Sequence, residues 1–195
     1  MPEQLCFSGF EHRPARDNLF FGLLWHARAA VEINKAAADL RHLLGLVGRP
    51  IEPERLHVSL HQVGRYDGPP NVIVERARQA GTIVSASSPP FALVFDRVMS
   101  FDNRREKRPV VLRPRYDLVR LFGLHDVLGQ AMKRARIGQP AMSHFTPHMT
   151  LLYDSRTVPE RPIEPIRMNV QDLLLVHSLV GQSRYIELAR WPLRG

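Results

Sequence analysis

One short pattern occurs twice in this chain, each time after a segment with helical periodicity. The two copies are His57-Val58-Ser59-Leu60 and His148-Met149-Thr150-Leu151. In a β-strand, side chains two positions apart share a face, and adjacent side chains point to opposite faces. Each copy therefore predicts a strand with a histidine and a hydroxyl on one face and two apolar side chains anchored in a core. A fold that accommodates both copies is expected to pack two related halves against one another.

Hydropathy patterns divide the rest of the chain into helices and strands. Apolar residues at helical spacing predict helices over about 26–46, 71–85 and 118–136. Strands are predicted at 19–25, 56–63, 91–98, 110–113, 148–153, 171–180 and 184–190, the last two as a hairpin that turns at Gly181-Gln182. Residues 1–17 are expected to be a polar N-terminal extension, and residues 18–195 a single two-lobed domain.

Composition narrows the class of ligand and the cellular setting. The net charge is +8, and the 27 basic residues are 24 Arg and 3 Lys. The guanidinium group pairs with phosphate oxygens in a bidentate way, so the arginine excess suits a polyanionic ligand, although solubility explains it equally well. The longest apolar run, Leu19–Trp25, is too short to cross a bilayer, and the start of the chain lacks the pattern of a signal peptide. The single cysteine, Cys6, excludes an internal disulfide, so we expect a cytoplasmic protein with no membrane partner.

The repeated pattern supplies the groups that phosphodiester cleavage requires. One imidazole can take a proton from the nucleophile while the other protonates the leaving oxygen, and two hydroxyls can donate hydrogen bonds to the non-bridging oxygens. Either copy alone is more often a half-buried strand histidine with satisfied ring nitrogens. The pair together favours His57 and His148 as catalytic residues and Ser59 and Thr150 as phosphate-binding residues. A third match, at His144, leads directly into a proline and is expected to mark only the start of a strand.

The sequence around both copies resembles a known family. Residues 53–64 and 145–153 resemble the paired His-x-Thr/Ser signatures of the two-histidine phosphoesterases, in particular the bacterial RNA 2′,3′-cyclic phosphodiesterases that are often named 2′-5′ RNA ligases. Residues 18–25 and 173–190 resemble the first strand and the last hairpin of that family. The resemblance implies a bilobal α+β fold with a pseudo-twofold duplication, in which two antiparallel sheets surround a central cleft and the helices lie outside.

The resemblance also implies an activity. It is the metal-independent hydrolysis of an RNA 2′,3′-cyclic phosphate to a 2′-phosphomonoester, with 2′-5′ RNA ligation as a side activity. In that reaction His148 would activate water and His57 would protonate the departing oxygen. The implied partners are RNA ends or small cyclic phosphates, bound by a monomer that needs no cofactor and no metal. One departure concerns phosphate binding, because Tyr153 and Asp154 stand where a basic residue often follows the second signature.

Other residues are weaker candidates. His61 continues the face of His57 in a regular strand and could contact substrate, and Tyr153 or Phe145 could stack on a base. A structural role is the alternative for each of the three. The arginines and lysine between residues 104 and 115 could hold an RNA backbone or belong to a solvated loop. His177 lies in an apolar strand and is expected to be structural.

Rival functions remain open at this point. His144 and His148 are spaced like zinc ligands on a helix, but Pro147 lies between them and no glutamate follows His144. The pair of histidines is also compatible with a different two-histidine enzyme that cleaves a small cyclic phosphate, and with a non-catalytic protein that binds RNA ends. Turnover of a 2′,3′-cyclic mononucleotide would separate an enzyme from a binding protein.

Overall fold

Two four-stranded antiparallel sheets form the centre of the molecule. The computed structural model describes residues 17–25, 27–102, 106–116, 118–138 and 145–195. Sheet A has the strand order β2-β1-β7-β8, and sheet B has the order β5-β4-β3-β6. The strands of sheet A are β1 (Asp17–Leu24), β2 (His57–Tyr66), β7 (Asp172–Leu179) and β8 (Arg184–Pro192). Those of sheet B are β3 (Phe91–Ser100), β4 (Arg108–Pro114), β5 (Met149–Asp154) and β6 (Arg161–Val170).

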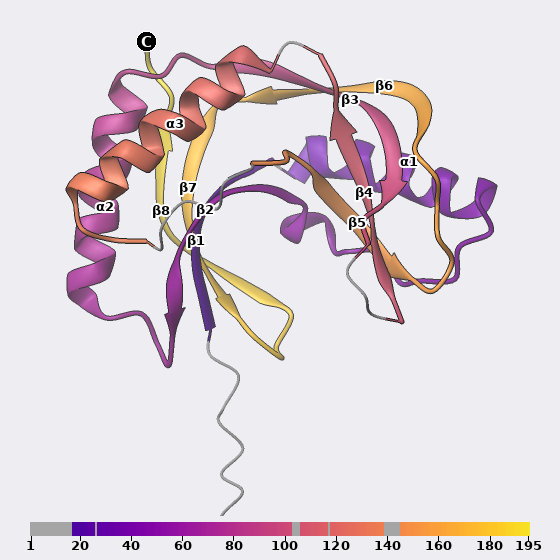
Figure 1. Cartoon of the computed structure of the whole chain (residues 1–195), viewed down its shortest axis with the longest axis horizontal. Helices are drawn as coiled ribbons and strands as arrows, with labels where there is room; N and C mark the ends of the chain where they lie inside the picture. Colours follow the sequence, from indigo (N-terminus) through magenta and orange to yellow (C-terminus); the bar gives the residue numbers. More distant parts are fainter. Residues whose placement is uncertain (1–16, 26, 103–105, 117, 139–144) are drawn as a thin grey trace, which may run out of the picture.

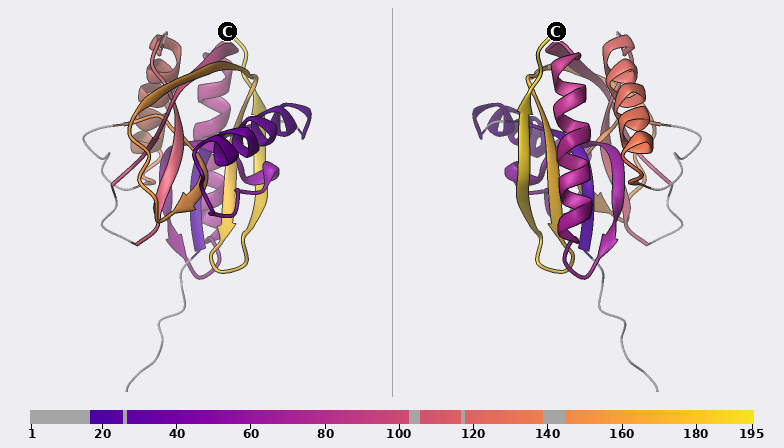
Figure 2. Two further views of the ribbon diagram at one scale, coloured as in Figure 1. Left: turned by 90° about the vertical axis from the view of Figure 1, so that its right-hand side faces the viewer. Right: turned by 90° about the vertical axis from the view of Figure 1, so that its left-hand side faces the viewer.

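Three helices cover the sheets and complete the α+β fold that was predicted. They are α1 (Ala27–Leu43), α2 (Asn71–Ala86) and α3 (Val119–Arg134), and a short 3₁₀ turn, Pro53–Arg55, precedes β2. Helices α2 and α3 lie side by side against sheet A, with α2 next to β7 and β8 and α3 next to β2 (Figure 2). Helix α1 lies on the opposite side of the molecule, by sheet B (Figure 1). In the part of the chain that the structure describes, no helix combines the length and apolar character that a membrane span requires.

The apolar residues of both repeated tetrapeptides lie in the main core, as the alternation predicted. Val58 and Met149 are 0% exposed, and Leu60 and Leu151 are also buried. Burying side chains of this size contributes on the order of 1.5–3 kcal/mol each. The core therefore fixes which face of β2 and β5 remains for the histidine and the hydroxyl.

Strand β6 is the described strand that the hydropathy pattern did not indicate. It contains Pro162 and Pro165, and only Met168 and Val170 are buried along it. Proline lacks an N–H group and is tolerated chiefly on edge strands, and β6 is an edge strand of sheet B. The two prolines and the polar residues hide the strand from a pattern search. Residues 1–16 of the predicted extension lie outside the described residues, and Asp17 already belongs to β1.

A buried carboxylate ties the chain after α1 to the end of β5. Asp154 is 2% exposed and accepts backbone hydrogen bonds from Val47 and Gly48, both at 2.7 Å, and from Arg156 at 2.8 Å. Burial alone would raise the pKa of Asp154, but the three N–H donors outweigh it and hold the pKa below its usual range. A Cβ at residue 48 would lie 2.1 Å from the carbonyl oxygen of Tyr153, so the close approach requires glycine. Asp154 is therefore part of the scaffold that holds β5.

Candidate active site

The two predicted histidines are oriented by the same local contact. Nδ1 of His57 donates to the carbonyl of Arg55 at 2.7 Å, and Nδ1 of His148 donates to the carbonyl of Thr146 at 2.8 Å. A carbonyl oxygen only accepts, so in the neutral rings Nδ1 carries the hydrogen and Nε2 presents a lone pair. In both cases the carbonyl belongs to the residue two positions before the histidine. The two halves of the molecule thus present chemically equivalent Nε2 atoms.

The two hydroxyl groups follow the histidines on their strands. Oγ of Ser59 lies 3.0 Å from Nε2 of His57, and it donates to the Nε2 lone pair of the neutral ring. Thr150 is half-buried on β5, and its hydroxyl has no hydrogen-bond partner among the described residues. The hydrogen bond of the Ser59 hydroxyl therefore depends on the protonation state of His57, whereas the Thr150 hydroxyl is available to a ligand.

Burial and nearby positive charge lower the pKa of both imidazoles. Burial lowers the pKa of His57 from 6.5 to about 4, the Arg55 carbonyl opposes this, and the charges of His148 and Arg55 lower it further. Burial also lowers the pKa of His148, with the Thr146 carbonyl opposing and the charge of Arg113 adding to the effect. The charge of His148 is among the causes that lower the pKa of His57, so the two rings interact electrostatically although they come from different sheets. Both rings are therefore mostly neutral at pH 7 in the free protein.

Aromatic side chains account for the removal of water from both imidazoles. The ring centroids of Phe20 and Tyr185 lie 5.1 and 5.4 Å from that of His57, and the Phe101 centroid lies 4.8 Å from that of His148. Phe20 belongs to a small apolar cluster that is separate from the main core. A low-polarity environment of this kind strengthens any hydrogen bond or charge interaction made inside it.

Arg113 is a site residue that only the strand register reveals. In the pairing of β4 with β5, Leu112 opposite Met149 is the last pair, and Arg113 and His148 are the next residues beyond the end of the ladder. The charge of Arg113 lowers the pKa of His148, which agrees with that position. Its Nε atom is buried and has no partner among the described residues. Arg113 thus supplies a positive charge beside the second histidine, where the sequence after that histidine offers none.

The expectation that His61 continues the face of His57 is wrong. Gly22 pairs with Ser59 but Phe21 pairs with His61, so Leu60 is an extra residue that forms a bulge in β2. The bulge interrupts the alternation of side chains. Nε2 of His61 donates to the carbonyl of His125 on α3 at 2.8 Å, and a Cβ at Gly129 of the same helix would lie 3.1 Å from the His61 ring. His61 therefore faces α3.

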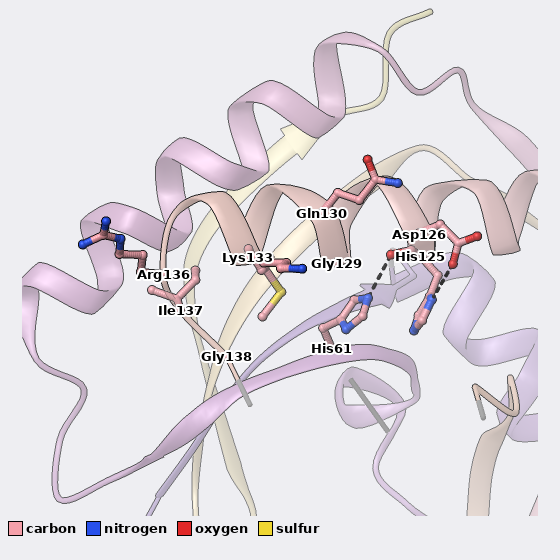
Figure 3. A pocket seen from close by; sticks show the side chains of 10 residues that line it. His61, His125, Asp126, Gly129, Gln130, Lys133, Arg136, Ile137 and Gly138 are labelled. Carbon is pink, nitrogen blue, oxygen red and sulfur yellow. Dashed lines mark hydrogen bonds and ion pairs between the residues drawn. The ribbon is translucent and has the colours of Figure 1, made fainter. Parts of the chain in front are cut away.

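A cavity of about 750 Å³ lies on that side of β2, beside the second half of α3 (Figure 3). His61, His125, Gln130 and Lys133 are among its lining residues, and neither catalytic candidate is. Lys133 lies in the last turn of α3, where a cation is favourable next to the helix C-terminus. The position of that lysine has an ordinary structural explanation, and we assign this cavity no part in the chemistry.

The aromatic candidates separate into one interior residue and one accessible residue. Phe145 stacks on His125 with 4.1 Å between centroids and meets Phe122 edge-on, so its ring is occupied by protein contacts. Tyr153 is 47% exposed on β5. Burial raises the pKa of Tyr185, Arg55 opposes it, and Tyr153 adds to it, so Tyr153 lies near the aromatic group around His57. Tyr153 remains available to a ligand, and Phe145 does not.

The remaining candidates have structural partners or fall outside the described residues. Nε2 of His177 lies 2.9 Å from Oδ2 of Asp17, a contact that joins β7 to β1, as expected of a structural histidine. In the basic stretch, Arg108 lies 3.7 Å from Asp102. Arg104, Arg105 and His144 lie outside the described residues. Among the residues that the structure describes, no group of three or more His, Cys, Asp or Glu side chains is placed to hold a metal ion.

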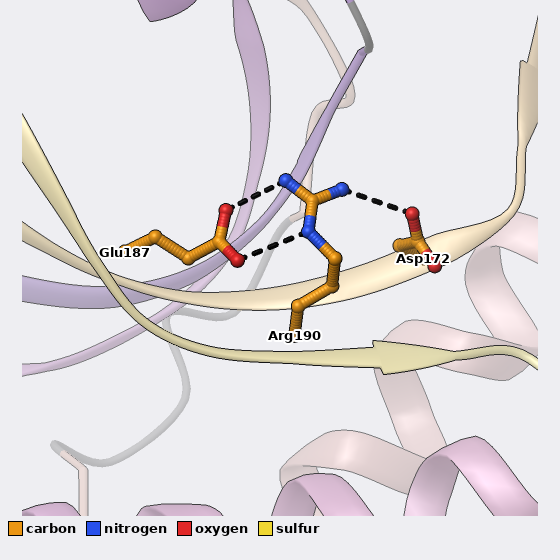
Figure 4. Close-up of polar contacts among 3 residues, drawn as sticks. All are labelled: Asp172, Glu187 and Arg190. Atoms are coloured by element: carbon orange, nitrogen blue, oxygen red, sulfur yellow. Dashed lines mark hydrogen bonds and ion pairs between the residues drawn. The ribbon is translucent and has the colours of Figure 1, made fainter.

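One arginine shows what full pairing looks like in this protein. Arg190 donates to both carboxylate oxygens of Glu187 at 3.0 and 2.6 Å and to Asp172 at 2.9 Å (Figure 4). The hydrogen bonds to Glu187 are the main reason that the pKa of Arg190 is raised. A guanidinium with two carboxylate partners has little left to offer an anionic ligand. Arg113 has no such carboxylate, and its electrostatic neighbour is a catalytic candidate.

Comparison with known proteins gives matches along nearly the whole chain. A family model described as the 2′-5′ RNA ligase superfamily matches residues 28–180. The structure of Escherichia coli LigT in apo form is 24% identical, with a TM-score of 0.70 over 93% of this chain and 99% of that chain. LigT complexed with 3′-AMP gives 25% identity and a TM-score of 0.71 over 92% and 99%. TT0787 of Thermus thermophilus is 21% identical, with a TM-score of 0.71 over 91% and 98%. No curated protein sequence matches.

Proposed function

Because the chain belongs to the 2′-5′ RNA ligase superfamily, we propose that it is a metal-independent RNA 2′,3′-cyclic phosphodiesterase with 2′-5′ RNA ligation as a side activity. The observation that carries the proposal is the matched pair of imidazoles. Each holds its Nδ1 hydrogen on a carbonyl and presents Nε2 for proton transfer. Two equivalent proton carriers beside one another suit a displacement at phosphorus in which one oxygen loses a proton while another gains one.

The proposed hydrolysis uses both Nε2 atoms in one step. Nε2 of His148 takes a proton from water as the water oxygen bonds to phosphorus. The bond from phosphorus to the 3′ oxygen breaks, and Nε2 of His57 gives its proton to that oxygen. The products are a 2′-phosphomonoester and a 3′ hydroxyl, and proton exchange with solvent restores both rings. In this proposal, Thr150 and Arg113 stabilise negative charge on the non-bridging oxygens, which the position of Thr150 on β5 and the charge of Arg113 near His148 support.

Substrate binding must favour protonation of the general acid, because both rings are mostly neutral in the free protein. An anionic phosphodiester next to an imidazole favours the charged form and raises its pKa. When Nε2 of His57 gains a proton, it can no longer accept from Ser59. The Ser59 hydroxyl is then free to donate to the phosphate. Protonation of His57 and formation of a phosphate contact are therefore coupled through the side chain of Ser59.

The division of roles between the histidines has its own test. The resemblance gives the acid role to His57, whereas the strongly lowered pKa of His57 in the free protein favours His148 as the carrier of a single proton. A nitrophenyl leaving group needs no proton, so loss of the general acid is tolerated with such a substrate. We expect a nitrophenyl phosphodiester to restore most of the activity of His57→Ala and little of that of His148→Ala. Restoration of His148→Ala instead would reverse the roles and leave the reaction class unchanged.

Tyr153 is proposed to contact the base of the terminal nucleotide. It is 47% exposed and lies near Tyr185, whose ring packs edge-on against His57. Stacking on an aromatic ring is a common way to hold an unpaired base. Structures of LigT complexed with 3′-AMP and with NADP+ support nucleotides as the ligand class.

Turnover of a 2′,3′-cyclic mononucleotide by the purified chain tests the function. We expect a 2′-phosphomonoester as the product, identified by phosphorus NMR, and loss of turnover in His57→Ala and His148→Ala. His42→Ala is the matched control, because His42 is exposed on α1. A chain that binds the nucleotide without converting it would be an RNA-end-binding protein. A chain that converts only a different small cyclic phosphate, such as ADP-ribose 1″,2″-cyclic phosphate, would belong to a different branch of two-histidine enzymes.

A further inference from the structure

A small cavity at one end of sheet B is lined by two arginine side chains that have no carboxylate partner among the described residues. It encloses about 220 Å³ between the start of β3, strand β6 and the beginning of α3. The lining residues are Pro90, Phe91, Ala92, Val94, Tyr116, Arg120 and Arg167. Arg120 lies in the first turn of α3 and Arg167 lies on β6, so segments distant in the sequence each contribute an arginine to the lining of one cavity.

The cavity lies on the face of sheet B that carries the catalytic candidate. Phe95 pairs with Pro114 and is buried in the core, so Val94 points to the same face as Arg113. Val94 pairs with Arg167, which places Arg167 on that face as well. With the order β5-β4-β3-β6, the strand spacing and the offset along the strands put the cavity on the order of 15–20 Å from His148. A short single-stranded segment can span that distance.

The charges around this cavity are unbalanced. Within the described residues, Arg120 and Arg167 form no hydrogen bond or ion pair with a side chain, and no acidic residue lines the cavity. Arg120 also stands in the first turn of a helix, where a cation is unfavourable, and the N-cap residue Leu118 provides no side-chain acceptor. Arg115 adds a third charge, 5.6 Å from the ring centroid of Tyr116. Residues that lower the stability of their local structure are typical of binding sites.

We propose that this Arg120–Arg167 pocket binds a backbone phosphate of the RNA strand upstream of its cyclic end, an inference that rests on the proposed function. The volume suits one phosphate group, and two guanidinium forks match its oxygens. The ring of Tyr116 is 65% exposed beside the pocket and offers a stacking surface for the neighbouring base. The pocket makes the protein prefer an RNA end to a free cyclic mononucleotide, and it takes no part in the chemical step.

Binding of a labelled RNA with a paired set of variants tests this inference. The probe is a single-stranded oligouridylate of about ten nucleotides with a 3′-terminal phosphate and a 5′ fluorescein, within the usual range of single-strand site sizes. Anisotropy titrations compare the wild type with the double variant Arg120→Ala/Arg167→Ala. The control is Arg76→Ala/Arg134→Ala, which removes the same net charge from two exposed positions on α2 and α3. We expect roughly tenfold weaker binding in the first variant, and a plot of log affinity against log salt whose slope is shallower by about 0.7, the value for one phosphate contact on a single strand.

The outcomes separate this inference from the proposed function. The proposed role of the pocket is refuted if the two double variants bind the oligonucleotide with equal affinity. It is also refuted if the wild type binds the oligonucleotide no more tightly than uridine 3′-phosphate. Turnover of a 2′,3′-cyclic mononucleotide should be the same in both double variants and the wild type. A selective loss of that turnover in Arg120→Ala/Arg167→Ala would place these arginines in the reaction and also overturn the inference. A wild type without any turnover would refute the proposed function, while the binding comparison would still decide on the pocket.

Discussion

Raising the pH from 6.5 to 8 should lower kcat/KM for a 2′,3′-cyclic mononucleotide by up to about 30-fold, because kcat/KM follows the protonation state of the free enzyme. The reactive form of the pair carries one proton. Because the pKa of His57 is lowered to about 4 and that of His148 lies below 6.5, both rings are mostly deprotonated above that pH. The singly protonated fraction then falls by up to tenfold for each pH unit, and 1.5 units give a loss of up to roughly 30-fold. The optimum of kcat/KM should lie between about pH 4 and 6.5.

Bound substrate should shift the optimum of kcat upward. One negative charge at about 4 Å, at an effective dielectric constant of about 20, favours the imidazolium by at most ~4 kcal/mol, and water in the site reduces this to an expected pKa increase of roughly 1–2 units. Steady-state rates across pH 4–9 at constant ionic strength give both profiles. Thermal unfolding at each pH serves as the control for stability. Phe101→Ala admits water to His148, raises its pKa, and should move the basic limb of kcat/KM to higher pH. A value of kcat/KM that rises to a plateau above pH 7.5 would refute the singly protonated pair as the reactive form.

Three further predictions concern the site and its scaffold. His57→Ala and His148→Ala should each lower kcat by roughly 10²–10⁴, and Thr150→Ala should lower kcat by about 10–10³. The kcat of the double histidine variant should be only slightly lower than that of either single variant, and additive losses would contradict a pair that acts as a unit. Activity should persist in excess EDTA, and a loss that zinc or manganese reverses would show a metal site. Asp154→Asn should lower the free energy of unfolding in urea by about 2–4 kcal/mol at pH 7, because one buried N–H then faces an amide NH₂ and two hydrogen bonds lose their charge. The difference from wild type should shrink only as the pH falls below about 3.8 toward the lowered pKa of Asp154, and Asp126→Asn at an exposed position should show neither effect.

Periodicity in the sequence predicts the scaffold of the site well because burial follows it closely. The alternation around His57 and His148 places Val58 and Met149 in the core, and both are fully buried. The exception is β6, where Pro162 and exposed polar residues remove the pattern that a buried strand would show. An edge strand obtains much of its stabilisation from main-chain pairing, which the identity of its side chains does not reveal.

The surroundings of the site depend on long-range pairing that a single sequence does not encode locally. His61 shares the i, i+2 spacing with Ser59, but an irregularity opposite β1 places it against α3. Arg113 looks like one of several arginines in a basic stretch until the register of β4 and β5 places it, like His148, just beyond the end of the ladder. Both cases require the partner strand to be known, because a shift of one residue moves a side chain to the other face.

The strand order of sheet A has a consequence for the order of events during synthesis. Strands β3 to β6 belong to sheet B and are consecutive in the chain, whereas β1 pairs with β7, and Asp17 contacts His177 across 160 positions. Contacts between such distant positions form late, because a long loop must close first. As the ribosome extends the chain, β1 can pair with β2, and sheet B can form once β6 has emerged, but sheet A is completed only by residues 172–192. His57 is thus translated early, but its strand acquires its final supports among the last, so a nascent chain is expected to be inert toward RNA ends.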